Sequence, residues 1–151
     1  MTEDLFRHLR VNTSVSEDNT NLLEDYTNFV DEVTSKESKN FPDMIHALAI
    51  LEEQGVNPAR LLTAGIGMAG EVGEFNEIIK KCLFQGKEMD EERIVHLRKE
   101  LGDVMWYIAQ ACLALNTNIE EIIDMNTVKL ESRYPGGFDA FRSENRKEGD
   151  I

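Results

Sequence analysis

Apolar residues along most of this chain recur at steps of three and four, the spacing that places them on one face of an α-helix. No segment shows the alternation of period two that is typical of a half-exposed strand. The periodic residues of the first helical stretch are Leu22, Leu23, Tyr26, Phe29, Val30 and Val33. A shorter helical stretch follows at residues 43–55. The pattern therefore predicts an all-α protein.

Start signals predict further helices between residues 57 and 134. Asn57-Pro58 offers a capping side chain followed by proline at the first helical position, and this helix should run to about residue 83. Asp90 can cap the next helix, and Thr117-x-x-Glu120 has the form of a capping box for the last one. Because the connections are mostly short, we expect antiparallel neighbours, as in a helix bundle.

The predicted organisation is one helical domain at residues 21–138, a weakly ordered N-terminal arm at 1–20 and a polar tail at 139–151. The chain has 29 acidic and 16 basic residues, with a formal net charge of −13. Such a surface disfavours nonspecific binding to nucleic acid and docking on an anionic membrane, because both need positive charge. There is no run of about 20 apolar residues and no signal-peptide core, so we expect a cytoplasmic protein.

Two acidic pairs, Glu71-x-x-Glu74 and Glu100-x-x-Asp103, fall inside predicted helices. A separation of three residues places both carboxylates of a pair on one helix face. Carboxylates that face one another raise each other's pKa unless a cation lies among them. Oxygen ligands of this kind suit Mg²⁺ or Mn²⁺ better than zinc or copper. Acidic pairs are also common on solvated faces, but the similar small and apolar neighbours of the two pairs favour a metal site.

Glycines interrupt the helix that carries the first pair. Residues 65–70 match the G-x-G-x-x-G dinucleotide fingerprint, but the preceding residues predict a helix, where that motif requires a buried strand. Gly67, Gly70 and Gly73 recur every three residues, so one stripe of the helix lacks side chains. We expect a neighbouring helix or a substrate to approach the backbone along this stripe.

The last predicted helix has a polar face of its own, with Asn126, Lys129 and Arg133 spaced over two turns. Lysine supplies a point charge and arginine a planar fork, and both suit phosphate oxygens. This face is therefore interpreted either as an anion clamp or as a solvated stripe.

Residues that follow the acidic pairs are further candidates for substrate binding. Lys80 and Lys81 can add to a phosphate site, although an ion pair between Glu77 and Lys81 is an equally reasonable role. Trp106 and Tyr107 can stack on a base, and their alternative role is packing in the core.

In this order and spacing, the motifs resemble the MazG-like nucleoside triphosphate pyrophosphohydrolases over about residues 60–138, and in particular the small single-domain members, several of them phage-encoded. The resemblance implies an all-α fold with a four-helix-bundle core, assembled as a homodimer or homotetramer. It also implies Mg²⁺-dependent cleavage of a (d)NTP between the α and β phosphates, giving a nucleoside monophosphate and pyrophosphate. A phage-encoded member would act in the host cytoplasm.

The resemblance also implies roles for individual residues. The metal ligands would be Glu71, Glu74, Glu100 and Asp103, and the phosphate contacts would be Asn126, Lys129 and Arg133. Glu71 or Glu74 would orient the attacking water.

Two other classes of protein were compared with this pattern. A ferritin-like di-iron bundle requires Glu-x-x-His pairs, which this sequence lacks, so His8, His46 and His96 are interpreted as surface or structural residues. The remaining alternative is a non-catalytic helical module that binds a nucleotide or another protein.

Overall fold

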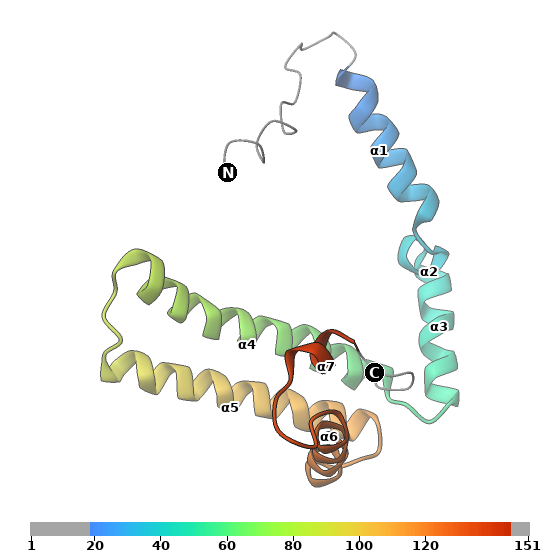
Figure 1. Ribbon diagram of the computed structural model, residues 1–151. Coiled ribbons are helices and arrows are strands. Elements are labelled where there is room, and N and C mark those ends of the chain that lie inside the picture. Colours follow the sequence, from blue (N-terminus) through green and yellow to red (C-terminus); the bar gives the residue numbers. More distant parts are fainter. Residues whose placement is uncertain (1–18, 146–151) are drawn as a thin grey trace. The chain divides into compact units, whose positions relative to one another are not determined.

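The computed structural model describes residues 19–145, and within that range every regular element is a helix (Figure 1). The all-α prediction is thus confirmed for these residues. They divide into two units, with the boundary between His46 and Ala47. The predicted N-terminal arm lies almost entirely outside the described residues, and the proposed domain boundaries stay a prediction.

The first unit contains α1 (Asn19–Val33), α2 (Lys36–Lys39) and the beginning of α3 (Phe41–Glu53). The Lys39 ammonium lies 3.5 Å from an Asp31 carboxylate oxygen, which links α2 to the end of α1. All the periodic apolar residues of α1 are exposed. Helix α3 begins at Phe41, two residues before the start that the sequence predicted, so Asp43 lies in the first turn of the helix and does not precede it as a cap.

The second unit is built on two long antiparallel helices, α4 (Pro58–Gln85) and α5 (Glu91–Ala114) (Figure 1). Both predicted caps are confirmed. The Asn57 side chain accepts a hydrogen bond from the Arg60 amide at 3.0 Å, and the Asp90 side chain accepts one from the Arg93 amide at 2.9 Å. Gly86, which ends α4, has a φ of 64°, in the left-handed region that glycine adopts without strain.

Hydrogen bonds at the open end of this hairpin fix how α4 and α5 align. The Asn57 amide donates to the Ala114 carbonyl at 2.9 Å, and the Asn116 side-chain amide donates to the Gly55 carbonyl at 2.7 Å. Between the helices, the buried apolar residues of the described chain are small in number and size: Ala64, Ile78, Cys112 and Ala114. The alignment therefore depends on polar contacts at the end as well as on this small core.

Helix α6 (Ile119–Arg133) follows α5 after a short turn and contacts it. Its cap differs by one residue from the predicted one. Asn118 accepts the hydrogen bond from the Glu121 amide at 2.9 Å, while the Thr117 hydroxyl donates to the Glu121 carboxylate. The tail contains a short helix that the sequence did not predict, α7 (Ala140–Glu144), capped by Asp139.

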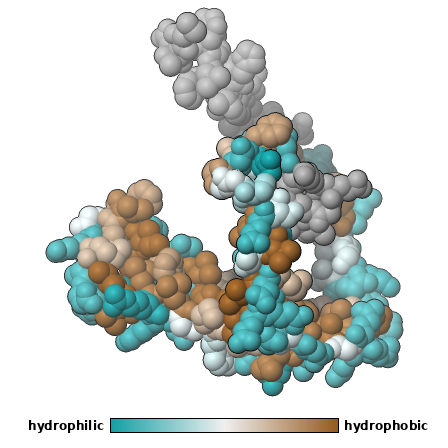
Figure 2. Space-filling model, turned by 60° about the horizontal axis from the view of Figure 1, so that its bottom comes forward, coloured by the Kyte–Doolittle hydropathy of each residue, from teal (hydrophilic) through white to brown (hydrophobic). Residues whose placement is uncertain are grey.

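A large share of the apolar residues in the second unit is exposed, and Figure 2 shows this brown surface along the hairpin. Exposed members on α4, α5 and α6 include Leu62, Ile66, Val72, Leu83, Phe84, Leu101, Met105, Leu113, Ile122, Ile123, Met125 and Val128. In the described part of this unit, the only extensive helix pair is the α4–α5 hairpin. The expected four-helix core therefore stays a prediction.

Candidate functional site

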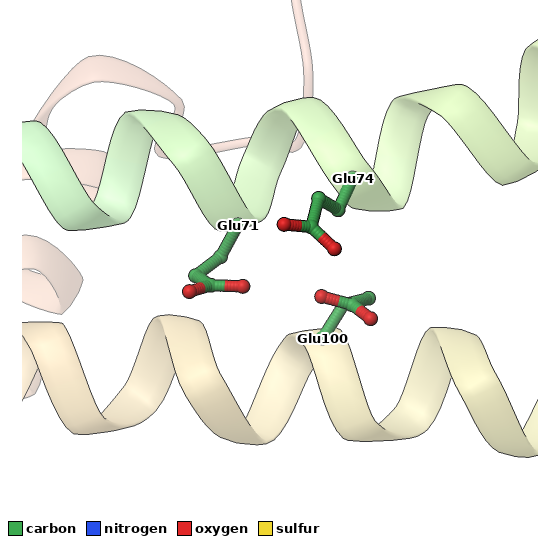
Figure 3. Close-up of side chains that lie close together, drawn as sticks. All are labelled: Glu71, Glu74 and Glu100. Carbon is green, nitrogen blue, oxygen red and sulfur yellow. The ribbon is translucent and has the colours of Figure 1, made fainter.

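The hairpin brings three predicted metal ligands together. Glu71 and Glu74 come from α4 and Glu100 from α5, and one carboxylate oxygen of each lies within 4.8 Å of the others. Figure 3 shows the three carboxylates in the space between the two helices. We call these residues the acidic cluster. Pairs far apart in the sequence meet here because α4 and α5 run antiparallel.

Burial differs sharply within the acidic cluster. Glu100 is only 5% exposed and is the one charged residue that is buried in the described part of the chain. Glu71 is partly buried, and Glu74 is exposed to solvent. The cluster is thus closed on the α5 side and open to solvent on the α4 side, where a ligand can enter.

The environment of Glu71 disfavours its negative charge. Burial raises the pKa of its carboxyl most strongly, and the charges of Asp103 and Glu74 raise it further. A hydrogen bond with Glu100 acts in the same direction, because two carboxyl groups share such a bond only when one of them carries a proton. The acidic cluster therefore favours a bound proton or cation.

Asp103, the fourth predicted ligand, lies beside the acidic cluster but does not belong to it. Its charge reaches Glu71, where it is second only to burial in raising the pKa. With Glu100 and His96 it also lines a surface hollow of about 450 Å³ along α5. Its role as a metal ligand stays a prediction.

The donor set fits the predicted cation. The cluster consists of carboxylate oxygens alone, without the thiol or imidazole ligands that zinc and copper prefer. Hard cations such as Mg²⁺ and Mn²⁺ take carboxylate and water ligands together, and the exposed side of the cluster leaves room for water. If a cation binds here, Glu71, Glu74 and Glu100 would hold it.

A residue that the sequence pattern did not assign to the site touches the cluster. The Nε2 atom of His96 lies 2.8 Å from Oε1 of Glu100. The two residues are four positions apart on α5, so the spacing that identified the acidic pairs could also have identified this neighbour.

Lys80 and Lys81 both pair with Glu77 in this structure. The Lys81 ammonium lies 3.6 Å from Glu77 Oε1, and the Lys80 ammonium contacts the other oxygen. The hydrogen bond from Lys80 is the main reason why the pKa of Glu77 is lowered. The structure thus shows the Glu77–Lys81 ion pair that the sequence offered as the alternative, together with a Glu77–Lys80 pair that it did not. Phosphate binding by these lysines stays a prediction.

The aromatic pair is divided between packing and exposure. The Tyr107 ring lies against α4 at Gly67, where an added Cβ would be 2.0 Å from the ring atom Cε1. Trp106 stands edge-on to Tyr107, with ring centroids 4.8 Å apart, and remains 53% exposed. Tyr107 therefore has a packing role, whereas Trp106 still offers surface to a ligand.

The glycine stripe is approached at one position only. Tyr107 occupies the space beside Gly67, but no atom lies within 4 Å of a Cβ built on Gly70 or Gly73. These two glycines directly precede Glu71 and Glu74 in the sequence, and neither meets a neighbouring helix.

Two of the three polar residues of α6, Asn126 and Lys129, are exposed, whereas Arg133 at the end of the helix is partly buried. Asn126 and Lys129 line a hollow of about 440 Å³ with Ile122 and Met125. The Arg133 guanidinium lies 5.9 Å from the centre of the Tyr134 ring. None of these residues lines the hollow beside Glu100, so a phosphate contact by this face stays a prediction.

Comparison with known proteins gives a family for this segment. Residues 61–138, which hold the acidic cluster and the polar face of α6, match the MazG nucleotide pyrophosphohydrolase domain. Gene 37 protein of Mycobacterium phage L5 is 36% identical over 83 residues, which cover 54% of this chain and 72% of that protein. No solved structure matches the chain. Among the described helices, none has the length and apolar character needed to cross a membrane.

Proposed function

Because the chain belongs to the MazG nucleotide pyrophosphohydrolase family, we propose that it is a Mg²⁺-dependent enzyme that hydrolyses a (d)NTP between the α and β phosphates. The products are a nucleoside monophosphate and pyrophosphate. The observation that carries this proposal is the convergence of Glu71, Glu74 and Glu100 between α4 and α5, inside the matched segment. Mn²⁺ would substitute for Mg²⁺, since both accept carboxylate oxygens.

The residues of the cluster would have different roles, namely metal ligation and orientation of the attacking water. A bound Mg²⁺ supplies charge neutralisation for the triphosphate and lowers the pKa of a coordinated water. Buried Glu100 would provide a fixed ligand, and Asp103, whose charge reaches Glu71, would contribute a further one. Glu71 or Glu74 orients the attacking water and accepts its proton.

Substrate binding is proposed for the groups that surround the cluster. Asn126, Lys129 and Arg133 would donate hydrogen bonds to phosphate oxygens and stabilise the charge that develops during hydrolysis. The exposed indole of Trp106 would stack on the base, with Tyr107 holding it edge-on.

Lys80 and Lys81 are secondary candidates for phosphate binding. Each now pairs with Glu77, and binding a phosphate would require exchange of that carboxylate for a phosphate oxygen.

A second copy of this chain is part of the proposal. Monomeric proteins rarely expose contiguous apolar patches larger than a few hundred Å². The apolar side chains left uncovered on α4, α5 and α6 go well beyond scattered single residues. Pairing of two hairpins would cover them and would supply the four helices that the family resemblance implies, as a homodimer or a homotetramer.

The experiment is a panel of the eight canonical (d)NTPs with Mg²⁺, in which the products are separated and identified. Monophosphate with pyrophosphate is expected for at least one nucleotide, and heavy-oxygen water then shows which phosphorus atom is attacked. Glu100→Gln should abolish turnover, and Glu120→Gln, on the exposed start of α6, is the matched control.

Two outcomes would contradict the proposal. Diphosphate with orthophosphate would identify a phosphatase instead. A lack of turnover together with a lack of Mg²⁺ binding would support the non-catalytic module.

A further inference from the structure

His96 is placed to control the buried ligand of the acidic cluster. Its Nε2 atom is 2.8 Å from Glu100 Oε1, a hydrogen-bond distance. Glu100 is 5% exposed, whereas the His96 side chain is 56% exposed. We propose that His96 is a positioning residue, which holds the Glu100 carboxylate in the orientation required for binding Mg²⁺ together with Glu71 and Glu74. This inference rests on the proposed function.

The chemistry of the two groups allows this role. A carboxylate has about four lone-pair positions, so Glu100 can accept a hydrogen bond from His96 and still bind a cation. Neutral imidazole with its proton on Nε2 is a sufficient donor. The role thus requires no positive charge on His96. Partners of this kind fix the rotation of a ligand before the metal arrives, which reduces the freedom lost on binding.

The position of His96 on α5 supports this role. His96 comes from α5, one turn before Glu100, and contacts its carboxylate from outside the acidic cluster. The contact uses Oε1, so the other carboxylate oxygen remains available to a cation held with Glu71 and Glu74. The His96 ring lies at the edge of two hollows, one of which extends towards Lys81 and Arg93.

A purely structural role makes a different prediction. An ion pair or hydrogen bond between residues four apart stabilises a helix slightly, whatever binds nearby. If that were its only role, loss of His96 would lower the melting temperature slightly and would leave the affinity for Mg²⁺ unchanged. A positioning role changes the affinity in the absence of nucleotide.

The test uses the full-length protein with His96→Ala and His96→Gln, at one mildly alkaline pH. The affinity for Mg²⁺ is measured by calorimetry without nucleotide, and then from the Mg²⁺ dependence of turnover at saturating nucleotide. Loss of such a partner typically weakens metal binding about 10–100-fold. Because His96 is exposed, about tenfold is expected for His96→Ala, with kcat at saturating Mg²⁺ nearly unchanged.

Two comparisons make the result specific. The side-chain amide of His96→Gln can donate from nearly the same place as Nε2 and should restore most of the affinity. Lys99→Ala changes a residue that lines the same hollow, and it should bind Mg²⁺ as the unchanged protein does.

Unchanged Mg²⁺ affinity in His96→Ala would overturn the inference, and so would a failure of His96→Gln to restore a lost affinity. Both results are distinct from a failure of the proposed function, in which the unchanged protein itself would neither bind Mg²⁺ nor hydrolyse a nucleotide.

Discussion

The contact between Tyr107 and Gly67 gives a sharp test of how α4 and α5 pack. A Cβ atom added at Gly67 would lie 2.0, 2.2 and 2.6 Å from three atoms of the Tyr107 ring. These separations are far inside van der Waals contact, so Gly67→Ala requires either a new position for the ring or a wider separation of the helices. Both changes disturb the hairpin that forms the acidic cluster.

The size of the effect follows from two opposing contributions. Replacing glycine by alanine inside a helix stabilises the helix by about 1 kcal/mol. Overpacking of a well-filled contact costs about 1–3 kcal/mol. The net change for Gly67→Ala should therefore lie between about zero and 2 kcal/mol of destabilisation. For a chain of this length, 1 kcal/mol corresponds to about 2–4 °C in melting temperature.

Gly65→Ala is the matched control. Gly65 lies in the same helix, is exposed, and has no atom within 4 Å of an added Cβ. It should therefore show only the helix contribution, a gain of about 1 kcal/mol. The two substitutions should thus differ by about 1–3 kcal/mol, and this difference isolates the ring contact because the helix contribution cancels.

A double-mutant cycle assigns that difference to Tyr107. In the background of Tyr107→Ala, Gly67→Ala should stabilise the protein as Gly65→Ala does, which gives a coupling of about 1–3 kcal/mol. The assay is urea unfolding followed by circular dichroism at one protein concentration, because association would change the apparent stability. The reasoning is refuted if Gly67→Ala and Gly65→Ala stabilise equally with Tyr107 in place.

Three further predictions concern charge. Glu74→Gln should leave the metal-free protein equally or more stable, because it relieves repulsion, but should remove the rise in melting temperature caused by Mg²⁺; a preserved rise would contradict ligation by Glu74. Lowering the pH through the raised pKa of Glu71 should protonate this carboxyl, which weakens Mg²⁺ binding, measured by calorimetry, and stabilises the metal-free fold, measured by melts. In Glu71→Gln, the contribution of this carboxyl to both pH dependences should be absent. Lys129→Ala should lower kcat/KM tenfold or more, for a lost charged contact of about 1.5–3 kcal/mol, without moving the melting temperature; unchanged kinetics would make this face a solvated stripe.

The long helices were predictable because their signals are local. Asn57 and Asp90 act through amides three residues away, so a short stretch of sequence contains the whole interaction. The predicted cap of α6 was wrong by one residue because two neighbouring residues offer the same kind of local signal. Thr117 and Asn118 are adjacent residues that can both cap a helix, and the chain uses Asn118 for the backbone while Thr117 bonds to the Glu121 side chain.

Contacts between helices were less predictable than the helices themselves. The spacing of the acidic pairs indicated one face on each helix, but the rotation of α5 about its own axis decides that Glu100 joins the cluster while Asp103 stays beside it. The glycine stripe illustrates the same limit. Spacing marked three equivalent positions, whereas only Gly67 meets an aromatic ring from the neighbouring helix. The spacing of four residues between His96 and Glu100 is readable in the sequence, but the burial of Glu100, which distinguishes this contact from other exposed pairs, is not.

The described chain buries a carboxylate and exposes many of its large apolar side chains, the reverse of what stabilises a lone monomer. A cation in the acidic cluster would offset the cost of burying the carboxylate. A second copy of the chain would cover the exposed apolar side chains. A partner that binds only the folded state adds stability by mass action, about 2.7 kcal/mol at a hundredfold excess over its dissociation constant. Both proposed partners would act on α4 and α5, which carry Glu71 and Glu100. Dilution that separates the copies should therefore also weaken Mg²⁺ binding. Sedimentation and calorimetry over one concentration series would measure the two together, and Mg²⁺ affinity that stays constant while the copies dissociate would show that the hairpin holds its site alone.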